Sequence, residues 1–107
     1  MPWLPCPYLG APVHLTRERQ RHIARRPPDL LPRERHRLAE TLADPDQVRR
    51  SPRVPSARLF SRWYTDPGGG KHVVVVVVTQ AAPARHWVVT AYLARRLAGG
   101  EVEWSRS

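Results

Sequence analysis

The chain has 107 residues, which is enough for one small domain with a single hydrophobic core. Hydrophobic residues make up 41% of it, as in a folded protein, and no apolar run approaches the roughly 20 residues that a membrane-spanning helix needs. The first residues show neither the basic nor the apolar region of a secretory signal. Cys6 is the only cysteine, which excludes an intramolecular disulfide, and we expect a cytoplasmic protein without membrane contact.

The charge is strongly positive. Lysine and arginine number 18 against 9 aspartate and glutamate residues, a formal net charge of +9. A field of this sign attracts polyanions such as nucleic acids. Lys71 is the only lysine, and genome base composition can explain arginine in place of lysine. It does not explain the excess of basic over acidic residues, so we expect a phosphate-bearing partner.

The first half of the chain predicts a tail and two helices. Residues 1–12 carry four prolines without periodicity and are interpreted as an extended tail before a single domain at 13–107. Thr16 suits the N-cap of a helix over 17–26, because its hydroxyl can accept a hydrogen bond from a main-chain N–H of the first turn. A second helix is predicted over 32–43, with an apolar stripe on one side.

The second half predicts strands, and six consecutive valines at 73–78 mark the central one. β-Branched side chains suit a pleated strand, and a strand that is apolar on both sides belongs in the middle of a sheet. Strands are expected at 57–64, 71–79 and 86–93, with shorter ones at 47–50 and 101–104. The predicted fold class is α+β, with two N-terminal helices packed on a three- to four-stranded antiparallel sheet.

Side chains alternate between the two faces of a strand, so the sequence allows the faces to be sorted. We expect the helices to cover a face that carries Trp63, Trp87, Val89 and Leu93. The opposite face is expected to carry Arg58, Arg62, Tyr64, His86, Thr90 and Tyr92. Guanidinium groups bind phosphates and aromatic rings stack on bases, so this set predicts an RNA-binding surface, with Arg58, Tyr64 and His86 as RNA contacts. An ordinary solvated sheet face would show the same pattern, and both interpretations stay open.

Metal-dependent chemistry is not predicted. The three long strands contain no Asp or Glu, whereas a divalent-metal nuclease needs carboxylates that converge on one site. The five histidines include no close pair at ligand spacing, so we expect no metal and no cofactor. RNA cleavage without a metal stays open, because the 2′-hydroxyl is an internal nucleophile that needs only a base, an acid and cationic stabilisation.

An ordered set of segments resembles a known group of nucleases. The segments are 15–23 (LTRERQRHI), 42–51 (LADPDQVRRS), 62–64 (RWY), Lys71 before the valines, and 88–92 (VVTAY). Together they resemble the phage-associated nuclease branch of the barnase–EndoU–colicin–RelE superfamily, and they span most of the chain. The resemblance implies a metal-independent ribonuclease fold, in which N-terminal helices precede a four-stranded antiparallel sheet.

The resemblance also implies a site. Members of the superfamily act as toxins or effector domains against tRNA or other RNA, so RNA and an antitoxin or immunity protein are the implied partners. At the matching positions His22 would be the acid or base, and Arg62 and Lys71 would clamp phosphates. Thr90 would be an orienting donor, and Tyr92 would stack a base or donate a proton. On spacing alone, His22 is more simply an ordinary helix residue.

Three hypotheses for the function follow. The first is a metal-independent endoribonuclease, toxin-like, that cleaves RNA by acid–base catalysis. The second is a non-catalytic RNA- or protein-binding module on the same fold. The third is an interaction protein whose exposed edge strand pairs with a partner. Cleavage of RNA, binding of intact RNA, and a stable complex without either would distinguish them.

Overall fold

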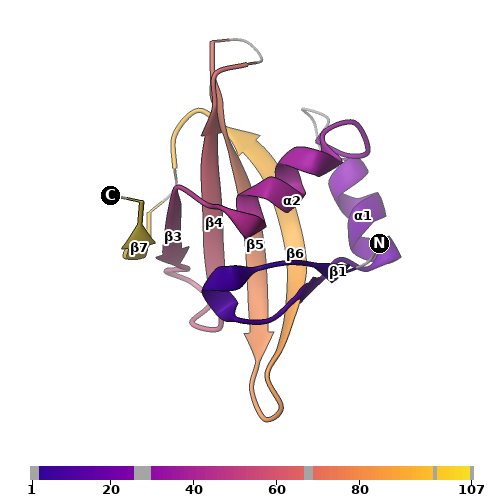
Figure 1. Ribbon diagram of the computed structural model, residues 1–107, viewed down its shortest axis with the longest axis vertical. Coiled ribbons are helices and arrows are strands. Elements are labelled where there is room, and N and C mark those ends of the chain that lie inside the picture. The colour runs from indigo at the N-terminus through magenta and orange to yellow at the C-terminus, as the bar shows by residue number, and fades with distance from the viewer. Residues whose placement is uncertain (1–2, 26–29, 67–68, 98, 107) are drawn as a thin grey trace.

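One mixed sheet of seven strands forms the body of the molecule, and two helices pack against it (Figure 1). The computed structural model describes residues 3–25, 30–66, 69–97 and 99–106. The order of the strands across the sheet is β1-β2-β6-β5-β4-β3-β7. The strands are β1 (Trp3–Leu4), β2 (Val13–His14), β3 (Gln47–Arg50), β4 (Ala57–Tyr64), β5 (Lys71–Gln80), β6 (Arg85–Ala94) and β7 (Glu101–Ser105). The helices are α1 (Arg17–Ala24), α2 (Arg35–Ala43) and the short 3-10 helix η1 (Pro7–Leu9).

The predicted α+β class with two packed helices is confirmed, but the prediction of three to four strands is wrong. Short strands extend the central meander on both sides, with β2 and β1 beyond β6, and β3 and β7 beyond β4. β2 pairs with β6 in the parallel direction, so the sheet is mixed. Strands as short as β1 and β2 hold too few residues to show a period of two, and the sequence pattern therefore undercounts them.

The N-terminal residues are part of the domain. Leu4 and Cys6 lie in the buried core, and β1 pairs with β2. Burial raises the pKa of the Cys6 thiol above its ordinary value, which is typical of an inert core cysteine. Residues 3–12, predicted as a tail, thus cover one end of the core.

Local signals position the helices. The Thr16 hydroxyl accepts a hydrogen bond from the Arg19 main-chain N–H (3.1 Å), so the predicted N-cap is confirmed. α1 ends at Ala24, and residue 26, the predicted last residue of this helix, lies outside the described residues. α2 begins at Arg35 rather than at Pro32, because residues 31–34 form a turn.

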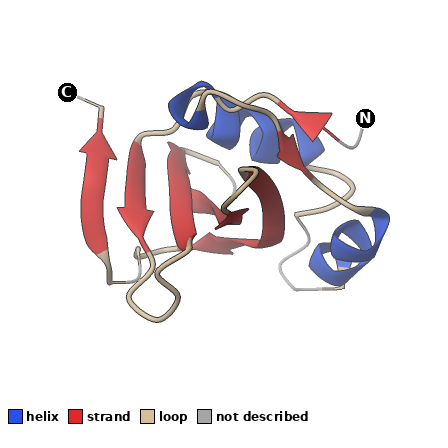
Figure 2. Ribbon diagram, turned by 90° about the horizontal axis from the view of Figure 1, so that it is seen from below, coloured by secondary structure: helices blue, strands red, loops and turns tan. Residues whose placement is uncertain are grey.

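The valine strand is central, as predicted. β5 lies between β4 and β6, and the odd-numbered Val73, Val75 and Val77 share one core with Phe60 of β4 and Leu42 of α2. α2 crosses β4 and β5, whereas α1 lies along β6. The sheet is strongly curved, and α2 packs on one face of it (Figure 2). None of the helices in the described residues is long and apolar enough to cross a bilayer.

Candidate functional site

The pairing of β4 with β5 separates two faces of the sheet. Phe60 pairs with Val75 and belongs to the core beneath α2, which defines the helix-covered face. Ser61 pairs with Val74 and points the other way. We call this other side the open face, because no described helix packs on it. Its side chains come from five strands: Gln47, Arg49, Leu59, Ser61, Trp63, His72, Val74, Val76, Val78, Trp87, Thr90, Tyr92 and Val102.

The predicted faces need correction. Trp63 and Trp87 were expected beneath the helices but lie on the open face, as partners of His72 and Val78. Trp63 is 43% exposed, which is inconsistent with a core position. Arg58, Arg62, Tyr64 and His86 were expected on the opposite face from the helices but lie on the helix-covered side, in step with Phe60 and Val88. Long polar side chains at the margin of a helix can lie beside it rather than beneath it.

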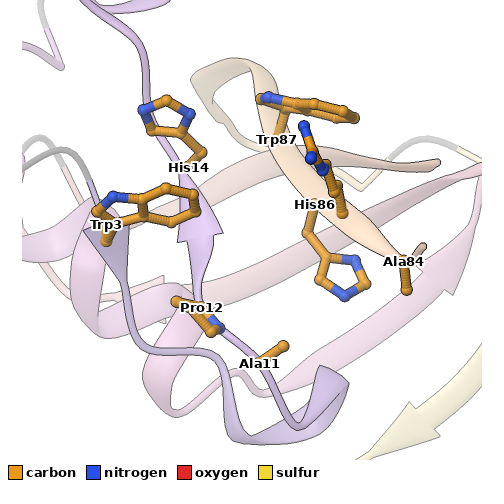
Figure 3. Close-up of a pocket in the computed structure, with 8 residues that line it drawn as sticks. Trp3, Ala11, Pro12, His14, Ala84, His86 and Trp87 are labelled. Atoms are coloured by element: carbon orange, nitrogen blue, oxygen red, sulfur yellow. The ribbon is translucent and has the colours of Figure 1, made fainter.

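A β-bulge in β6 divides the rest of the predicted set. Val77 pairs with Val88 and Val76 with Thr90, so Val89 is an extra residue. Before the bulge His86 and Val88 point to the helix-covered side, and after it Ala91 and Leu93 do. The expected position of Leu93 is therefore confirmed. Thr90 and Tyr92 fall on the open face, apart from His86, and Figure 3 shows His86 and Trp87 diverging from adjacent positions of β6.

Aromatic and cationic side chains meet on the open face. The rings of Trp63 and His72 are 4.9 Å apart between centroids and meet edge to face. The Trp63 main-chain N–H donates to Asp46 Oδ2 (2.7 Å), and Arg49 Nε donates to Gln47 Oε1 (2.6 Å). These bonds hold the ends of β3 and β4. The side chains of Trp63, His72 and Arg49 surround the valines of β5 on this face.

The environment of His72 favours its neutral form. Burial lowers the pKa of the imidazole below its ordinary value. The Asp46 carboxylate opposes this shift, and the Arg49 guanidinium adds to it. A neutral imidazole at pH 7 can accept a proton, which is the first requirement of a general base.

Thr90 contributes an unusual hydroxyl. Its Oγ1 atom is buried and has no hydrogen-bond partner among the described residues. A buried hydroxyl destabilises the folded state by about 1–3 kcal/mol unless a water or a ligand satisfies it. Tyr92 lies on the same strand and side, and pairs with Val74.

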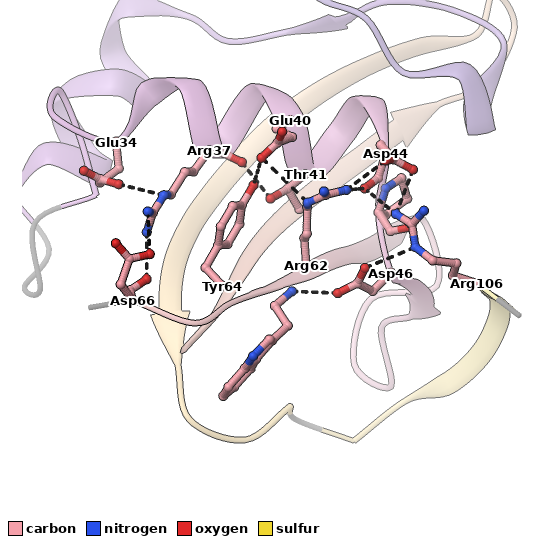
Figure 4. A network of polar contacts seen from close by, with 12 residues as sticks. Glu34, Arg37, Glu40, Thr41, Asp44, Asp46, Arg62, Tyr64, Asp66 and Arg106 are labelled. Carbon is pink, nitrogen blue, oxygen red and sulfur yellow. Dashed lines mark hydrogen bonds and ion pairs between the residues drawn. The ribbon is translucent and has the colours of Figure 1, made fainter. Parts of the chain in front are cut away.

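Arg62 and Tyr64 are engaged with the acidic side chains of α2 and of its C-terminal end (Figure 4). Arg62 pairs with Asp44 (2.9 Å) and lies 3.7 Å from Glu40. The Tyr64 hydroxyl donates to Glu40 in a short hydrogen bond. Burial, followed by Glu40, raises the pKa of Tyr64 to about 12. This arrangement is a structural network, and a phosphate at Arg62 would have to compete with two carboxylates.

Three further predicted residues are dispersed. Arg58 Nε pairs with Glu103 (2.8 Å), and Lys71 begins β5 opposite Tyr64 on the helix-covered side. His86 is buried, and its Nδ1 lies 2.8 Å from the Thr79 hydroxyl. Burial lowers the pKa of His86, and the charge of Arg58 lowers it further. The eight predicted residues therefore do not form one cluster.

His22 lies on α1, the helix that borders the open face. It is exposed on α1, the helix that runs along β6. A groove of about 410 Å³ lies between the start of α1 and β6, lined by Thr16 and Arg19 on one side and by Val78 and Trp87 on the other. Since Val78 and Trp87 belong to the open face, α1 forms one border of that face.

Sequence reasoning missed Arg49, Trp63, His72 and Trp87 as members of the site. The alternation of β5 does place His72 in step with Val74, Val76 and Val78, so one signal was present. The sequence does not show which side of the sheet lies beneath the helices, because that depends on the pairing of β4 with β5 and on the position of the bulge.

Among the described residues, no group of three or more His, Cys, Asp or Glu side chains is placed to hold a metal ion.

No protein-family model, curated protein or solved structure matches this chain.

Proposed function

We propose that this chain binds single-stranded RNA along the open face of its sheet and cleaves it without a metal ion. The observation that carries the proposal is the gathering of Arg49, Trp63, His72 and Tyr92 on a face that no described helix covers. The net charge of +9 favours a polyanionic ligand. The order of helices followed by an antiparallel meander supports a relation to the phage-associated nucleases that the sequence resembles.

Each side chain suits a part of RNA recognition. Unpaired bases stack on aromatic rings, and Trp63 and Trp87 offer two indoles on one face. The Arg49 guanidinium can form two hydrogen bonds with a phosphate. Double-stranded RNA would bury its bases, so the open face suits an unpaired loop or end.

The cleavage proposed for this face uses the RNA's own nucleophile. A base removes the proton of the 2′-hydroxyl, the 2′-oxygen attacks the adjacent phosphorus, and the bond to the 5′-oxygen breaks with a proton from an acid. The products are a 2′,3′-cyclic phosphate and a free 5′-hydroxyl. His72 is suited to the base and Tyr92 to the acid, while Arg49 stabilises the charge on the phosphorane. His22, on the bordering helix, is the other candidate for proton transfer.

A second candidate is binding without cleavage. It is favoured by the pairing of Arg58 and Arg62 with carboxylates, which leaves fewer free cations for a reacting phosphate. The stacking surface of Trp63 and Trp87 needs no acid–base pair to hold RNA.

The test is incubation of tRNA and of unstructured RNA with the purified protein in EDTA, beside His72→Ala and Tyr92→Phe. His36→Ala is the matched control, because His36 is exposed on α2 on the other side of the sheet. Cleavage by the wild type and the control, but not by His72→Ala, supports the ribonuclease. Salt-sensitive binding of intact RNA supports the second candidate. If the protein neither binds nor cleaves RNA, both candidate functions are wrong.

A further inference from the structure

A pocket of about 520 Å³ opens between the N-terminal strands and the start of β6 (Figure 3). Its walls include Trp3 and His14 on one side and Arg85, His86 and Trp87 on the other. The volume lies within the range of about 300–1,000 Å³ that is typical of small-molecule sites. None of the described residues that line it is acidic.

The pocket continues the open face. Trp3 pairs with His14, and His14 pairs with Trp87, which in turn pairs with Val78 of the open face. Partners in neighbouring strands point to the same side of a sheet, so the three rings form one row at its β1 end. The residues that alternate with them, Leu4 and Val13, point into the core.

The rings in this row present flat surfaces. Trp3 and His14 are stacked, with centroids 4.3 Å apart and planes 14° apart, which holds the indole in a fixed orientation. Trp3 remains 51% exposed, so a ring face is accessible to a ligand. An exposed indole held in place on a basic domain is a ready stacking platform for a nucleobase.

Polar groups complete the pocket. Arg85 is exposed at its wall and has no carboxylate partner among the described residues, so it can bind a phosphate. His86 also lines the pocket, but its ring points to the helix-covered side, where Nδ1 lies 2.8 Å from the Thr79 hydroxyl. A flat aromatic surface and a guanidinium suit the base and the phosphate of a nucleotide.

We propose that this pocket is a nucleotide subsite, in which one base of the RNA stacks on Trp3 while its phosphate contacts Arg85. The inference deepens the proposed function and rests on it, because the same RNA would continue along the row of rings onto the open face. The subsite would select an unpaired base next to the segment that Arg49 and His72 contact.

The experiment is an NMR titration of the protein with each nucleoside 5′-monophosphate, with inorganic phosphate as a comparison. We expect shifts of the Trp3 and Trp87 indole N–H signals with the nucleotides, and no comparable shift with phosphate. Trp3→Ala should raise the Kd by roughly tenfold, as loss of one stacking surface does, and Trp3→Phe should restore most of the affinity. Trp104→Ala, at an indole of similar exposure that packs near Tyr8, and Arg53→Ala, in an exposed turn, are the matched controls for Trp3→Ala and Arg85→Ala.

The outcomes separate the subsite from the nuclease. If nucleotides bind with the expected dependence on Trp3 while RNA stays intact in EDTA, the subsite stands and the cleavage proposal falls. If RNA is cleaved but no nucleotide shifts the indole signals, or Trp3→Ala binds as well as Trp104→Ala, the subsite is wrong. Equal shifts with inorganic phosphate alone would also overturn it, because they would locate the binding at the guanidinium without a base.

Discussion

The guanidinium of Arg19 donates a hydrogen bond to the main-chain carbonyl of Val89 (3.3 Å), at the extra residue of the β6 bulge. Val89 has no pairing partner on β5, and the arginine from α1 contacts it from the side. The bulge brings Val88 and Ala91 into the core and leaves Thr90 for the open face. The contact from α1 thus stabilises the bulge that places the hydroxyl groups of Thr90 and Tyr92 on the open face.

Replacing Arg19 should loosen the bulge. Arg19→Met keeps much of the aliphatic chain but removes the hydrogen bond, so we expect the free energy of unfolding to fall by about 0.5–1.5 kcal/mol. Amide hydrogen exchange should accelerate at residues 88–91 more than elsewhere in β6. Arg17→Met, on an exposed position of the same helix, should change neither quantity. Equal effects of the two variants would show that the Arg19 hydrogen bond does not stabilise the bulge.

The same strand shows where prediction from the sequence stops. The six valines at 73–78 identified the central strand, because a run of β-branched residues is a local signal. A bulge is not local, because it depends on how β6 pairs with β5. An uninterrupted alternation grouped His86 with Thr90, and the single extra residue placed them on opposite sides.

The assignment of Trp63 was wrong for a different reason. A tryptophan in a strand was expected in the core, whereas the core side of β4 is filled by Phe60 and, at the margins, by arginines that pair with carboxylates. Those ion pairs join β4 to α2 and β7, which are distant in the sequence. The predicted alternation of side chains along β4 was correct. Which of its two faces points to the helices depends on tertiary contacts, which no local pattern contains.

Gly70 should be required for the position of Trp63. A Cβ atom at Gly70 would lie 2.1 Å from Trp63 Cζ2, and the φ angle of +106° favours glycine. We expect Gly70→Ala to displace the indole, lower the free energy of unfolding by about 1–3 kcal/mol, and shift the tryptophan fluorescence. Gly69→Ala is a suitable control, because Gly69 also has a positive φ, +85°, but open space around it. If the two variants lose the same stability, the strained backbone accounts for the loss and the contact with Trp63 does not.

The ion pairs of Glu103 should make stability depend on pH. Its carboxylate pairs with Arg50 (2.6 Å) and Arg58 (2.8 Å), and these interactions hold the pKa of Glu103 below its ordinary value despite the opposing effect of burial. A lowered pKa in the folded state adds stability that is complete above the ordinary glutamate pKa and is lost as the pH falls through the lowered value. Glu103→Gln should therefore be less stable than the wild type at pH 7, by roughly 1 kcal/mol, with the difference shrinking below the ordinary pKa. Urea unfolding at a series of pH values measures this, and a difference independent of pH would contradict it.

Arg49 and Arg62 should have separable effects. Arg62 pairs with Asp44 and Glu40, so Arg62→Ala should lower stability and change RNA affinity little. Arg49 lies on the open face, so Arg49→Ala should weaken RNA binding and reduce the slope of log K against log[salt] by about 0.7, the value for one phosphate contact with a single strand. Fluorescence anisotropy with labelled RNA at several salt concentrations measures both. A reduced slope for Arg62→Ala with an unchanged slope for Arg49→Ala would move the phosphate contact to the helix-covered side.

The hydroxyl of Thr90 should be dispensable for folding and needed for RNA. Because Oγ1 is buried without a partner among the described residues, Thr90→Val removes an unsatisfied polar atom while keeping the shape of the side chain. We expect the free energy of unfolding to stay constant or to rise by up to about 1–2 kcal/mol. RNA cleavage, or RNA binding if the protein does not cleave, should fall.

Thr41 provides the matched comparison. It is also buried, but its hydroxyl donates to the Arg37 carbonyl (2.7 Å), so Thr41→Val should lose stability without a specific effect on RNA. A Thr90→Val variant that unfolds as readily as Thr41→Val would mean that the Thr90 hydroxyl has a structural partner. A variant that keeps both its stability and its action on RNA would remove Thr90 from the site and leave Arg49, His72 and Tyr92 to account for it.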